Sequence, residues 1–489
     1  MKKIGLIALF LGLFTAMNAQ DQTDALRYSQ VFYQGTARSM AMGNAFGALG
    51  ADFSSLSTNP AGIGFYRSSE FTVSPEIYSR KTGSTYNGRF GEDARTNFDL
   101  SNLGFVLTTK VPEGSSQTPW KFYQFAFGMN RSNTFSNRMF IEGDNQDHSK
   151  IDVYLDEAYG VDYRILEDEA SGRYGFDLYP AWYVYLIDTI PGYRDQYTSP
   201  VPQGGIRQQQ SVTTWGSTNE WLFSGGANLN DKLFIGATVG LPFVRYFKES
   251  TYTEFDVADT IAGFDYWNYK ERLTTKGWGI NLKLGVIVWP VDWLRLGAAF
   301  HTPTAFYDLT DYYTTTTDAK LGPDYNVKSS PNGQYNYSLT TPLRAIGSMG
   351  IIVGKYGLLS ADYEFVNYAT ARLRAPDYTF SDENSVIRND YQSTYNLRFG
   401  TEWRYTNFSF RGGYAIYGSP YANQQNNGEM RTYSFGLGYN EGNFGLDLAY
   451  VHGSMQQDYY LYSSENYTTN ATKQDLNSNN FVLTLRTKF

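Results

Sequence analysis

The stretch that decides the fold is residues 392–417, which read QSTYNLRFGTEWRYTNFSFRGGYAIY. Side chains alternate between apolar and polar over its first half. One face carries Tyr395, Leu397, Phe399 and Trp403, and the other carries Asn396, Arg398, Glu402 and Arg404. A period of two predicts a β-strand. The two residues 405–406 separate it from a second alternating run, so the stretch predicts two antiparallel strands joined by a tight turn.

The same pattern recurs along the chain in fourteen runs: 70–79, 98–109, 120–130, 216–229, 232–246, 270–288, 293–307, 335–353, 356–368, 392–404, 407–417, 430–439, 443–453 and 479–489. Their connections alternate in length. The short ones are 110–119, 230–231, 289–292, 354–355, 405–406 and 440–442. The long ones are 80–97, 131–215, 247–269, 308–334, 369–391, 418–429 and 454–478.

This asymmetry is typical of an outer-membrane barrel, which has short periplasmic turns and long outer loops. A closed barrel is also the all-strand structure that satisfies every backbone group in lipid. We therefore predict an all-β protein, a fourteen-stranded antiparallel transmembrane β-barrel over residues 70–489, in the bacterial outer membrane and in contact with its lipid. Several runs exceed the 9–11 residues that span a bilayer, so those strands should project beyond it.

The composition agrees with this prediction. The 489 residues include 47 Gly and no Cys, and 17% of them are aromatic. The absence of Cys excludes disulfides, thiolate metal sites and a thiol nucleophile. The mean hydropathy of −0.43 argues against a helical membrane protein. A net charge of −8 with no basic run argues against a nucleic-acid partner.

The first residues are typical of an export signal. Lys2 and Lys3 precede an apolar segment over residues 4–15, and the small residues Ala16 and Ala19 follow. We interpret residues 1–20 as a secretory signal peptide. The apolar segment is too short to be a membrane-spanning helix, which needs roughly 20 residues.

Residues 21–69 do not alternate and are rich in small side chains. They contain two motifs, Ala37-Arg-Ser-Met-Ala-Met-Gly-Asn-Ala45 and Asn59-Pro60-Ala61-Gly62. Glycines at 43, 47 and 50 do not form a nucleotide-binding loop, because no strand precedes them and no Lys-Ser/Thr pair follows.

Three further elements accompany these two motifs: Thr341-Pro342-Leu343-Arg344, the strand Leu359–Phe365 and the terminal Phe489. In these five elements the chain resembles the FadL/TodX family of outer-membrane transporters of hydrophobic compounds. The resemblance implies that residues 21–69 form a hatch in the barrel lumen. It also implies passive uptake of fatty acids or aromatic hydrocarbons. Phe489 is similar to the signal that the barrel assembly machinery reads, which would make that machinery a partner.

The resemblance also implies a gating site. The hatch residues Asn59, Pro60, Ala61 and Gly62 would bind ligand or gate its passage, opposite a kink in the third strand where the wall opens sideways. Gly128 lies in the third predicted strand and is our candidate for a bulge there.

Two further sets of residues are candidates for ligand binding. Arg295, Arg344, Arg398 and Arg411 fall on the lumen face and are candidate partners for a carboxylate, although each is also a candidate for a structural ion pair with Glu364, Glu402 or Asp362. The long connection 131–215 contains an apolar segment with Tyr179, Trp182 and Leu186. It is either a capping loop packed on itself or an outer site that captures an apolar ligand.

We therefore predict a channel for passive uptake of hydrophobic small molecules, with long-chain fatty acids as the favoured ligand and the hatch as its gate. The alternative is an interaction barrel similar to the type IX secretion shuttle, which would bind secreted proteins on its outer loops. We expect no enzymatic activity, since no nucleophile motif is present. We also expect no metal or cofactor. The histidines at 148, 301 and 452 are scattered, and the acidic residues near 142–147 match no calcium loop.

Overall fold

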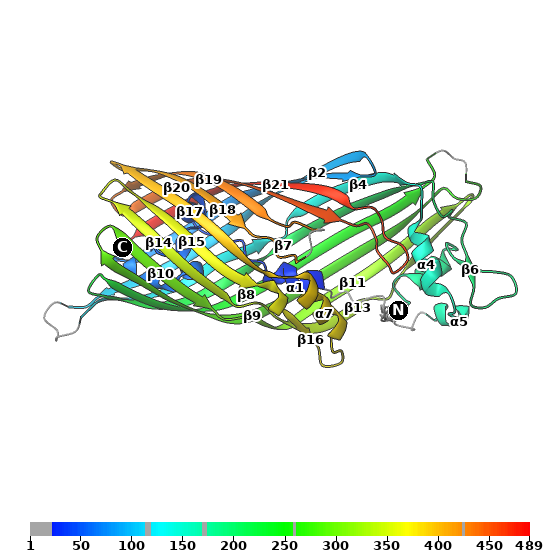
Figure 1. The fold of residues 1–489 in the computed structure, drawn as a ribbon, viewed down its shortest axis with the longest axis horizontal. Helices are drawn as coiled ribbons and strands as arrows, with labels where there is room; N and C mark the ends of the chain where they lie inside the picture. The colour runs from blue at the N-terminus through cyan, green and yellow to red at the C-terminus, as the bar shows by residue number, and fades with distance from the viewer. Residues whose placement is uncertain (1–21, 113–118, 169–173, 258–260, 423–425) are drawn as a thin grey trace, which may run out of the picture.

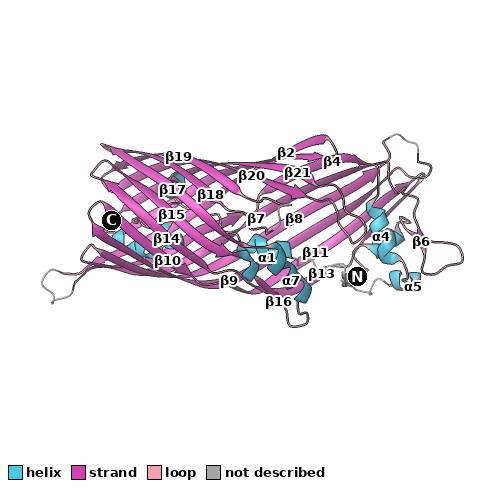
Figure 2. Cartoon of the chain, viewed as in Figure 1, coloured by secondary structure: helices cyan, strands magenta, loops and turns pink. Residues whose placement is uncertain are grey.

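The computed structural model describes residues 22–112, 119–168, 174–257, 261–422 and 426–489 (Figure 1). The predicted signal peptide therefore lies outside the described residues. Most of the described chain is strand (Figure 2). The sheet closes on itself because β1 (Glu70–Tyr86) pairs with β21 (Thr472–Lys488). The predicted fourteen-stranded antiparallel barrel is confirmed.

Three positions in the wall are each built from two strands in succession. These pairs are β3 (Trp120–Thr134) with β4 (Asn137–Asn145), β10 (Leu294–His301) with β11 (Ala305–Leu321), and β13 (Gly333–Thr340) with β14 (Arg344–Val353). Pro303 and Pro342 lie in the second and third breaks, where the missing N–H interrupts the ladder. The sequence pattern treated 293–307 and 335–353 as unbroken runs.

Single strands form most of the other positions: β2 (Arg89–Lys110), β7 (Ile206–Leu229), β8 (Leu233–Phe255), β9 (Tyr266–Val291), β15 (Gly357–Asn367), β17 (Ser393–Tyr405), β18 (Phe408–Tyr417), β19 (Met430–Glu441) and β20 (Phe444–Tyr459). Two short strands extend the sheet. β12 (Asp324–Ser329) pairs with β11, and β16 (Arg372–Arg374) pairs with β13.

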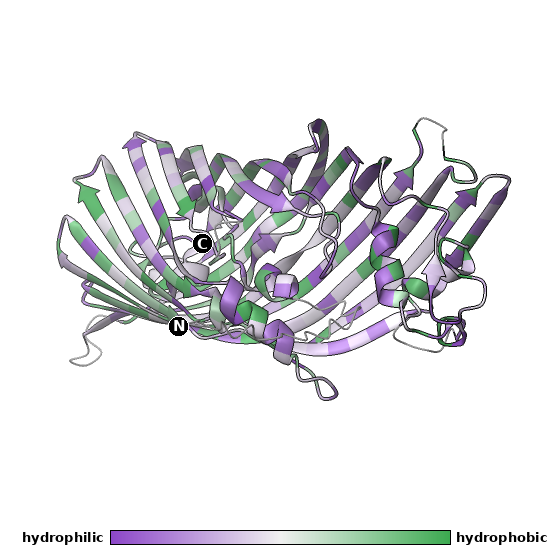
Figure 3. Ribbon diagram, turned by 45° about the vertical axis from the view of Figure 1, so that its right-hand side comes forward, coloured by the Kyte–Doolittle hydropathy of each residue, from purple (hydrophilic) through white to green (hydrophobic). Residues whose placement is uncertain are grey.

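The wall has its apolar face outside and its polar face inside. On β17, Tyr395 and Phe399 are 48% and 45% exposed, whereas Arg398 and Glu402 are fully buried. Figure 3 shows hydrophobic and hydrophilic residues alternating along the strands. This arrangement suits a wall that faces lipid. Among the described residues, no helix is long and apolar enough to cross a bilayer.

The barrel is cut obliquely at its outer end (Figures 1 and 3). Strands β7, β8 and β9 have 24, 23 and 26 residues, whereas β15 and β18 have 11 and 10. The long strands project beyond a bilayer, as predicted. The connection expected as a loop over residues 80–97 is instead largely strand, because β1 and β2 continue to a tight turn at Asn87-Gly88, where φ is positive at both residues.

The outer connection between β4 and β7 folds into a small domain that we call the cap, described over residues 146–168 and 174–205. It contains α4 (Lys150–Ala158), α5 (Tyr163–Leu166), α6 (Leu178–Tyr183), β5 (Asp188–Thr189) and β6 (Tyr197–Thr198). Its apolar core continues onto the outer ends of β8 and β9 through the buried rings of Tyr252 and Trp267. The cap therefore packs on the side of the barrel that is formed by the long strands β8 and β9 (Figure 1).

Residues 22–69 precede the first strand, and we call them the hatch. They form α1 (Gln22–Ser29), α2 (Ala37–Ala41), α3 (Ser55–Thr58) and the 3₁₀ helix η1 (Pro60–Phe65). The apolar face of α1 packs against α7 (Ser381–Asp390), which belongs to the connection between β15 and β17 together with η2 (Tyr368–Thr370). The rest of the hatch contacts inward-facing residues of the wall on many strands.

Candidate functional site

The hatch fits against the wall where the wall residues are glycines. A Cβ at Gly236 would lie 2.3 Å from the carbonyl oxygen of Pro60, and a Cβ at Gly413 would lie 2.1 Å from the amide nitrogen of Gly43. Real Cβ atoms do not approach other atoms so closely, so only glycine allows these contacts. Further wall glycines in such contact are Gly104, Gly128, Gly226, Gly285, Gly297, Gly400 and Gly436. We call these nine residues the glycine ring.

The motif Asn59-Pro60-Ala61 fastens the hatch to the wall. The Asn59 side chain is fully buried, and its Nδ2 donates to the carbonyl oxygens of Gly47 at 2.6 Å and Val286 at 3.2 Å. Its Oδ1 accepts from the amide of Ala61 at 3.1 Å, which caps η1. Pro60 occupies the first position of that helix, where its missing N–H is tolerated. One amide group thus joins two parts of the hatch to β9.

The place of this motif differs from the expectation. The resemblance implied a position opposite a kink in the third strand, but Asn59 and Pro60 lie against β8 and β9, where Gly236 and Gly285 leave room for them. One hatch residue beside the third strand is Phe53, whose ring contacts Gly104 and Gly128. The small size of Ala61 does allow close approach to the wall, as expected.

Three of the four candidate arginines are occupied by carboxylates of the wall. Arg344 and Arg398 share Glu364, and the bond from Arg398 Nη1 measures 2.7 Å. Arg411 binds Glu402 and Asp447, each at 2.7 Å. The structural ion pair, which the sequence left open, therefore accounts for these three arginines. Arg344 also donates to the Ser29 carbonyl at 2.6 Å, so this network holds the hatch as well.

Arg295 is different from the other three. No carboxylate pairs with it in the described parts of the chain, and its Nε is buried without a hydrogen-bond partner. Its guanidinium lies 4.5 Å from the ring centre of Phe65 and 4.2 Å from that of Trp289. Such stacking favours a cation but leaves its N–H groups available. Of the four candidates, Arg295 is the one without a carboxylate partner among the described residues, and its Nε is open to a ligand.

The wall has a seam between β2 and the following strand. The ladder between β2 and β3 ends at the pair Asn102 and Asn130, and no ladder joins β2 to β4 in the described residues. Beyond that point the hatch takes the place of β2. The amides of Phe32 and Gln34 donate to the carbonyls of Ser132 at 2.8 Å and Arg131 at 3.0 Å. A hatch segment, rather than a wall strand, therefore completes the barrel here.

The predicted bulge lies near Gly128 but not at it. Gly128 is paired regularly with Gly104 on one side and Leu222 on the other. The register shifts on β3 fall between Trp120 and Phe122 and between Arg131 and Asn133. Gly128 is a glycine because the ring of Phe53 and the carbonyl of Leu103 occupy the space above it. The prediction of a bulge at Gly128 was wrong by a few residues, since close packing and not strand bending requires that glycine.

Polar side chains also make contacts across the seam, near the hatch segment. Arg131 lies 3.1 Å from Glu76 and 2.9 Å from Asp99. Asn97 Nδ2 donates to Ser136 Oγ at 2.8 Å. Side-chain contacts of this kind are individually weaker than a continuous backbone ladder. At the seam, side-chain contacts of this kind therefore stand where the rest of the wall has a backbone ladder.

Cavities lie on both sides of the hatch. Two small ones, of about 50 and 70 Å³, flank its extended segment near residues 28–34. A larger one, of about 580 Å³, lies between the hatch and the short-turn end of the barrel and includes Arg295 in its lining. The lumen is thus filled in its middle and hollow toward the short-turn end.

The three candidate capture residues are held inside or against the cap: Leu186 belongs to its core, Trp182 packs against that core, and Tyr179 is buried beside it. Tyr179 and Leu186 are buried, and the ring of Trp182 packs on those of Tyr163 and Tyr197, each 5.9 Å away between ring centres. The capping-loop alternative therefore explains the apolar segment, and these three side chains do not line an open groove. The sequence pattern did not distinguish a buried core from an exposed capture surface.

The cap is attached to β8 by the buried carboxylate of Glu254. It accepts hydrogen bonds from Ser149 Oγ at 2.5 Å and from the amide of Lys150 at 2.8 Å, at the start of α4. It also accepts from Tyr252 Oη at 2.6 Å and Trp267 Nε1 at 2.8 Å. Sequence reasoning missed this residue, because a lone Glu near a strand end carries no signal of burial.

The histidines and the acidic loop have structural contacts of their own. His301 Nε2 lies 2.9 Å from the Thr58 carbonyl, and His148 Nδ1 lies 2.7 Å from Tyr462 Oη. Asp144 is bound by Arg207 at 2.7 Å and by Arg89 at 3.0 Å. Among the described residues, no group of His, Asp and Glu has the arrangement of a metal site.

Comparison with solved structures gives the same architecture. The toluene transporter TodX of P. putida is 14% identical, with a TM-score of 0.54 over 93% of this chain and 98% of its own. A FadL homologue of Pseudomonas aeruginosa is 12% identical, with a TM-score of 0.54 over 94% of this chain and 99% of its own. No family model matches the sequence, and no curated protein matches it either.

The closed, plugged wall and these likenesses define a class: the chain is an outer-membrane β-barrel with a hatch in its lumen. Within that class, it has the fold of the FadL/TodX transporters of hydrophobic compounds, so the resemblance drawn from the two hatch motifs is confirmed at the level of the fold.

Proposed function

We propose that this barrel is a passive uptake channel for small hydrophobic molecules and that the hatch is its gate. The observation that carries this proposal is the seam, where the hatch backbone at Phe32 and Gln34 completes the wall in place of a strand. Movement of this segment opens a path from the lumen into the side of the wall. An apolar molecule that leaves by such a path does not have to cross water.

The solved neighbours support the ligand class. One is named a toluene transporter and another a FadL homologue. We propose hydrophobic compounds of this kind as ligands, with long-chain fatty acids as the favoured ones. The cavities of about 50 and 70 Å³ beside the hatch are smaller than the roughly 150 Å³ of a cavity that holds benzene. Passage therefore requires the hatch to move.

A reversible cross-link tests the gate. The chain has no Cys, so an introduced pair reacts only with itself. Asn130 Nδ2 on β3 donates to Ser57 Oγ of the hatch at 2.8 Å, so Ser57→Cys with Asn130→Cys ties the hatch to the wall at the seam. We expect uptake of toluene and of a radiolabelled fatty acid by a deletion strain to stop when the pair is oxidised and to return when it is reduced.

The matched control joins two neighbouring strands and leaves the hatch free. Thr316 and Ser329 touch through their hydroxyls at 2.9 Å on the hairpin of β11 and β12. Thr316→Cys with Ser329→Cys should form a disulfide without changing uptake. Equal uptake by the oxidised and reduced forms of the hatch pair would refute gating by the hatch.

A second candidate function is the binding of secreted proteins, as in the type IX shuttle. The cap favours it because it exposes large apolar side chains, namely Tyr159, Ile165, Tyr183, Tyr185 and Tyr193. Exposed apolar groups of this kind are typical of interaction surfaces. Tyr183→Ser with Tyr185→Ser should then lower the amount of secreted protein outside the cell while hydrophobic uptake stays normal. Unchanged secretion would refute this candidate.

A further inference from the structure

The cavity of about 580 Å³ at the short-turn end has a ceiling and a rim of different chemistry. Its ceiling is apolar and consists of Leu49 and Phe65 from the hatch and Ile352 and Leu358 from the wall. We call this cavity the vestibule. Its volume lies within the roughly 300–1,000 Å³ of ligand pockets in proteins.

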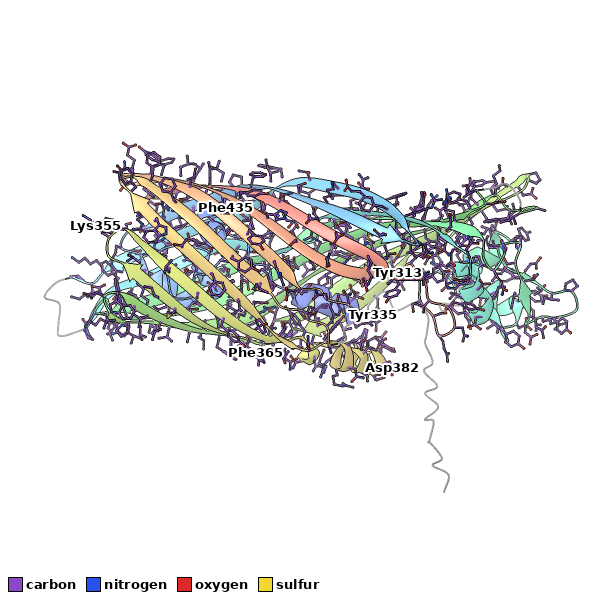
Figure 4. All side chains as sticks on the ribbon, turned by 45° about the horizontal axis from the view of Figure 1, so that its top comes forward. Tyr313, Tyr335, Lys355, Phe365, Asp382 and Phe435 are labelled. Carbon is purple, nitrogen blue, oxygen red and sulfur yellow. The ribbon has the colours of Figure 1, made fainter. Side chains whose placement is uncertain are left out.

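The rim of the vestibule is strongly basic. Eight cationic side chains line the cavity against two carboxylates: Arg38, Arg67, Arg295, Lys355, Arg404, Arg411, Arg486 and Lys488 face Glu70 and Glu402. Figure 4 places Lys355 at the short-turn end of the barrel. Such an excess of one sign within a concave surface attracts ions of the opposite sign.

Several of these cations share a carboxylate partner. Arg38, Arg404 and Arg411 converge on the single carboxylate of Glu402 at 2.6–2.8 Å. That group keeps an excess of positive charge even though each member has a partner. The whole chain has a net charge of −8, so this concentration of positive charge does not follow from its composition.

Three cations of the vestibule have no carboxylate partner among the described residues: Arg295, Lys355 and Lys488. Arg295 is held in place by Phe65 and Trp289, and Phe65 itself belongs to the ceiling. Its free N–H groups thus lie beside the apolar surface. A guanidinium in this position presents paired donors that match the two oxygens of a carboxylate.

We propose that the vestibule is a binding site for an amphiphilic carboxylate, with its head group on Arg295 and its apolar chain against the ceiling. The site deepens the proposed function, on which it rests, because it selects ionisable acids among hydrophobic ligands. It also gives the ligand a second route: release toward the short-turn end, in addition to lateral escape through the seam.

Calorimetric titration of the purified barrel in a neutral detergent tests the site, with dodecanoate and dodecanol as probes. We expect wild type to bind dodecanoate about tenfold or more tightly than dodecanol, because the alcohol cannot form the charge-assisted pair. Arg295→Gln should weaken dodecanoate binding about tenfold and leave dodecanol binding unchanged. Added salt should weaken the binding of the acid alone.

Lys121→Gln is the matched control, because Lys121 is an exposed cation near the same end of the barrel that does not line the vestibule. Lys488→Gln provides an independent test if Arg295→Gln fails to assemble, as judged by heat-modifiable migration. It should weaken dodecanoate binding more than the control does. Equal binding of acid and alcohol by wild type, or dodecanoate binding by the assembled variants equal to that of the control, overturns the proposal.

Failure of this proposal is separable from failure of the proposed function. Toluene carries no charge and needs no cationic partner, so its uptake by wild-type cells tests the channel independently of the vestibule site. Normal toluene uptake with no preference for dodecanoate refutes the vestibule site alone. Absence of toluene and fatty-acid uptake by wild-type cells refutes the channel itself, and absence of dodecanoate binding refutes the vestibule site as well.

Discussion

The hatch and the cap both occupy an opening of the barrel, but they are built in opposite ways. The cap has a core of large apolar side chains around Leu178, Leu186 and Trp267 and is anchored by the many-partnered carboxylate of Glu254. The hatch also buries large apolar side chains, such as Phe46 and Leu56, but apart from α1 they divide among four small clusters with wall residues. The hatch also contacts glycines of the wall and forms separate hydrogen bonds and ion pairs with it. One continuous apolar core buries more surface at a single place than several small clusters do.

This difference predicts which part moves. We expect an element held by several small apolar clusters and by single polar contacts to leave its place at a lower cost than a continuous apolar core. A folded apolar core does not separate without unfolding. We therefore expect the hatch to be the mobile part and the cap to be a fixed part, and the following changes test that contrast from the largest expected effect to the smallest.

The largest effect should come from Gly236→Val. The new Cβ would lie 2.3 Å from the Pro60 carbonyl oxygen, which is backbone and cannot turn aside. Overpacking of this kind costs on the order of 3 kcal/mol, so the hatch should be displaced from its contacts with the wall. Ion conductance in planar bilayers should rise. Gly225→Val is the control, because no atom lies within 4 Å of that position. Equal conductance of the two variants would show that the glycine ring does not hold the hatch.

Glu254→Ala should act on the cap alone. It leaves Ser149, Tyr252 and Trp267 without their common acceptor, which should cost about 3 kcal/mol. Limited proteolysis should cut the cap faster while heat-modifiable migration of the barrel is retained. Glu249→Ala on the same strand is the control, since its side chain is 52% exposed. A cap equally resistant in both variants would contradict its dependence on this anchor.

Asn59→Ala should loosen the hatch by a smaller amount. It removes two donated bonds and the cap of η1, for which about 1 kcal/mol is expected. Hydrogen exchange of amides in residues 47–62 should become faster, while exchange in the cap stays the same. Acceleration in both regions would mean that the hatch and the cap form one cooperative unit, and the contrast between them would fail.

The smallest effect concerns pH. Burial lowers the pKa of the Lys150 ammonium in α4 to about 8, from an ordinary value near 10.4. Between these values the unfolded cap holds more protons than the folded cap, so cap stability should rise as the pH is raised from 8 to 9.5. The residue is half-buried, so the change should stay below about 1 kcal/mol. Lys150→Met should abolish it, as measured by the rate of proteolysis of the cap.

Much of the fold follows from the sequence because a lipid-facing wall forces strict alternation. Tyr395 and Arg398 already show in the sequence the opposite faces that they occupy in β17. The partnership of Arg398 with Asp362 and Glu364 was also foreseeable, since these residues face the same lumen. The turn at Asn87-Gly88 carries the signal of a tight hairpin, which indicates that the expected loop is strand.

The site was less predictable, because it depends on contacts between distant segments. Nothing local shows that Gly285 and Asn59 meet, although a glycine on the inward face of a strand does indicate close approach of another backbone. The seam is only partly visible in the sequence. The apolar positions of β2 change from even to odd numbers between Leu100 and Leu103, where the pairing with β1 shifts its register, but nothing local shows that the ladder to β3 stops at Asn102. Burial of Tyr179 and Leu186 depends on the fold of the whole cap.

The position of the hatch before β1 has a consequence for assembly. Strand β1 pairs with β21, so the first and last strands of the barrel meet to close it. The glycine ring is spread over most of the wall, from Gly104 on β2 to Gly436 on β19. A segment that touches so much of the circumference cannot be threaded in easily after closure. We therefore expect the sheet to close around a hatch that already lies against its inner face.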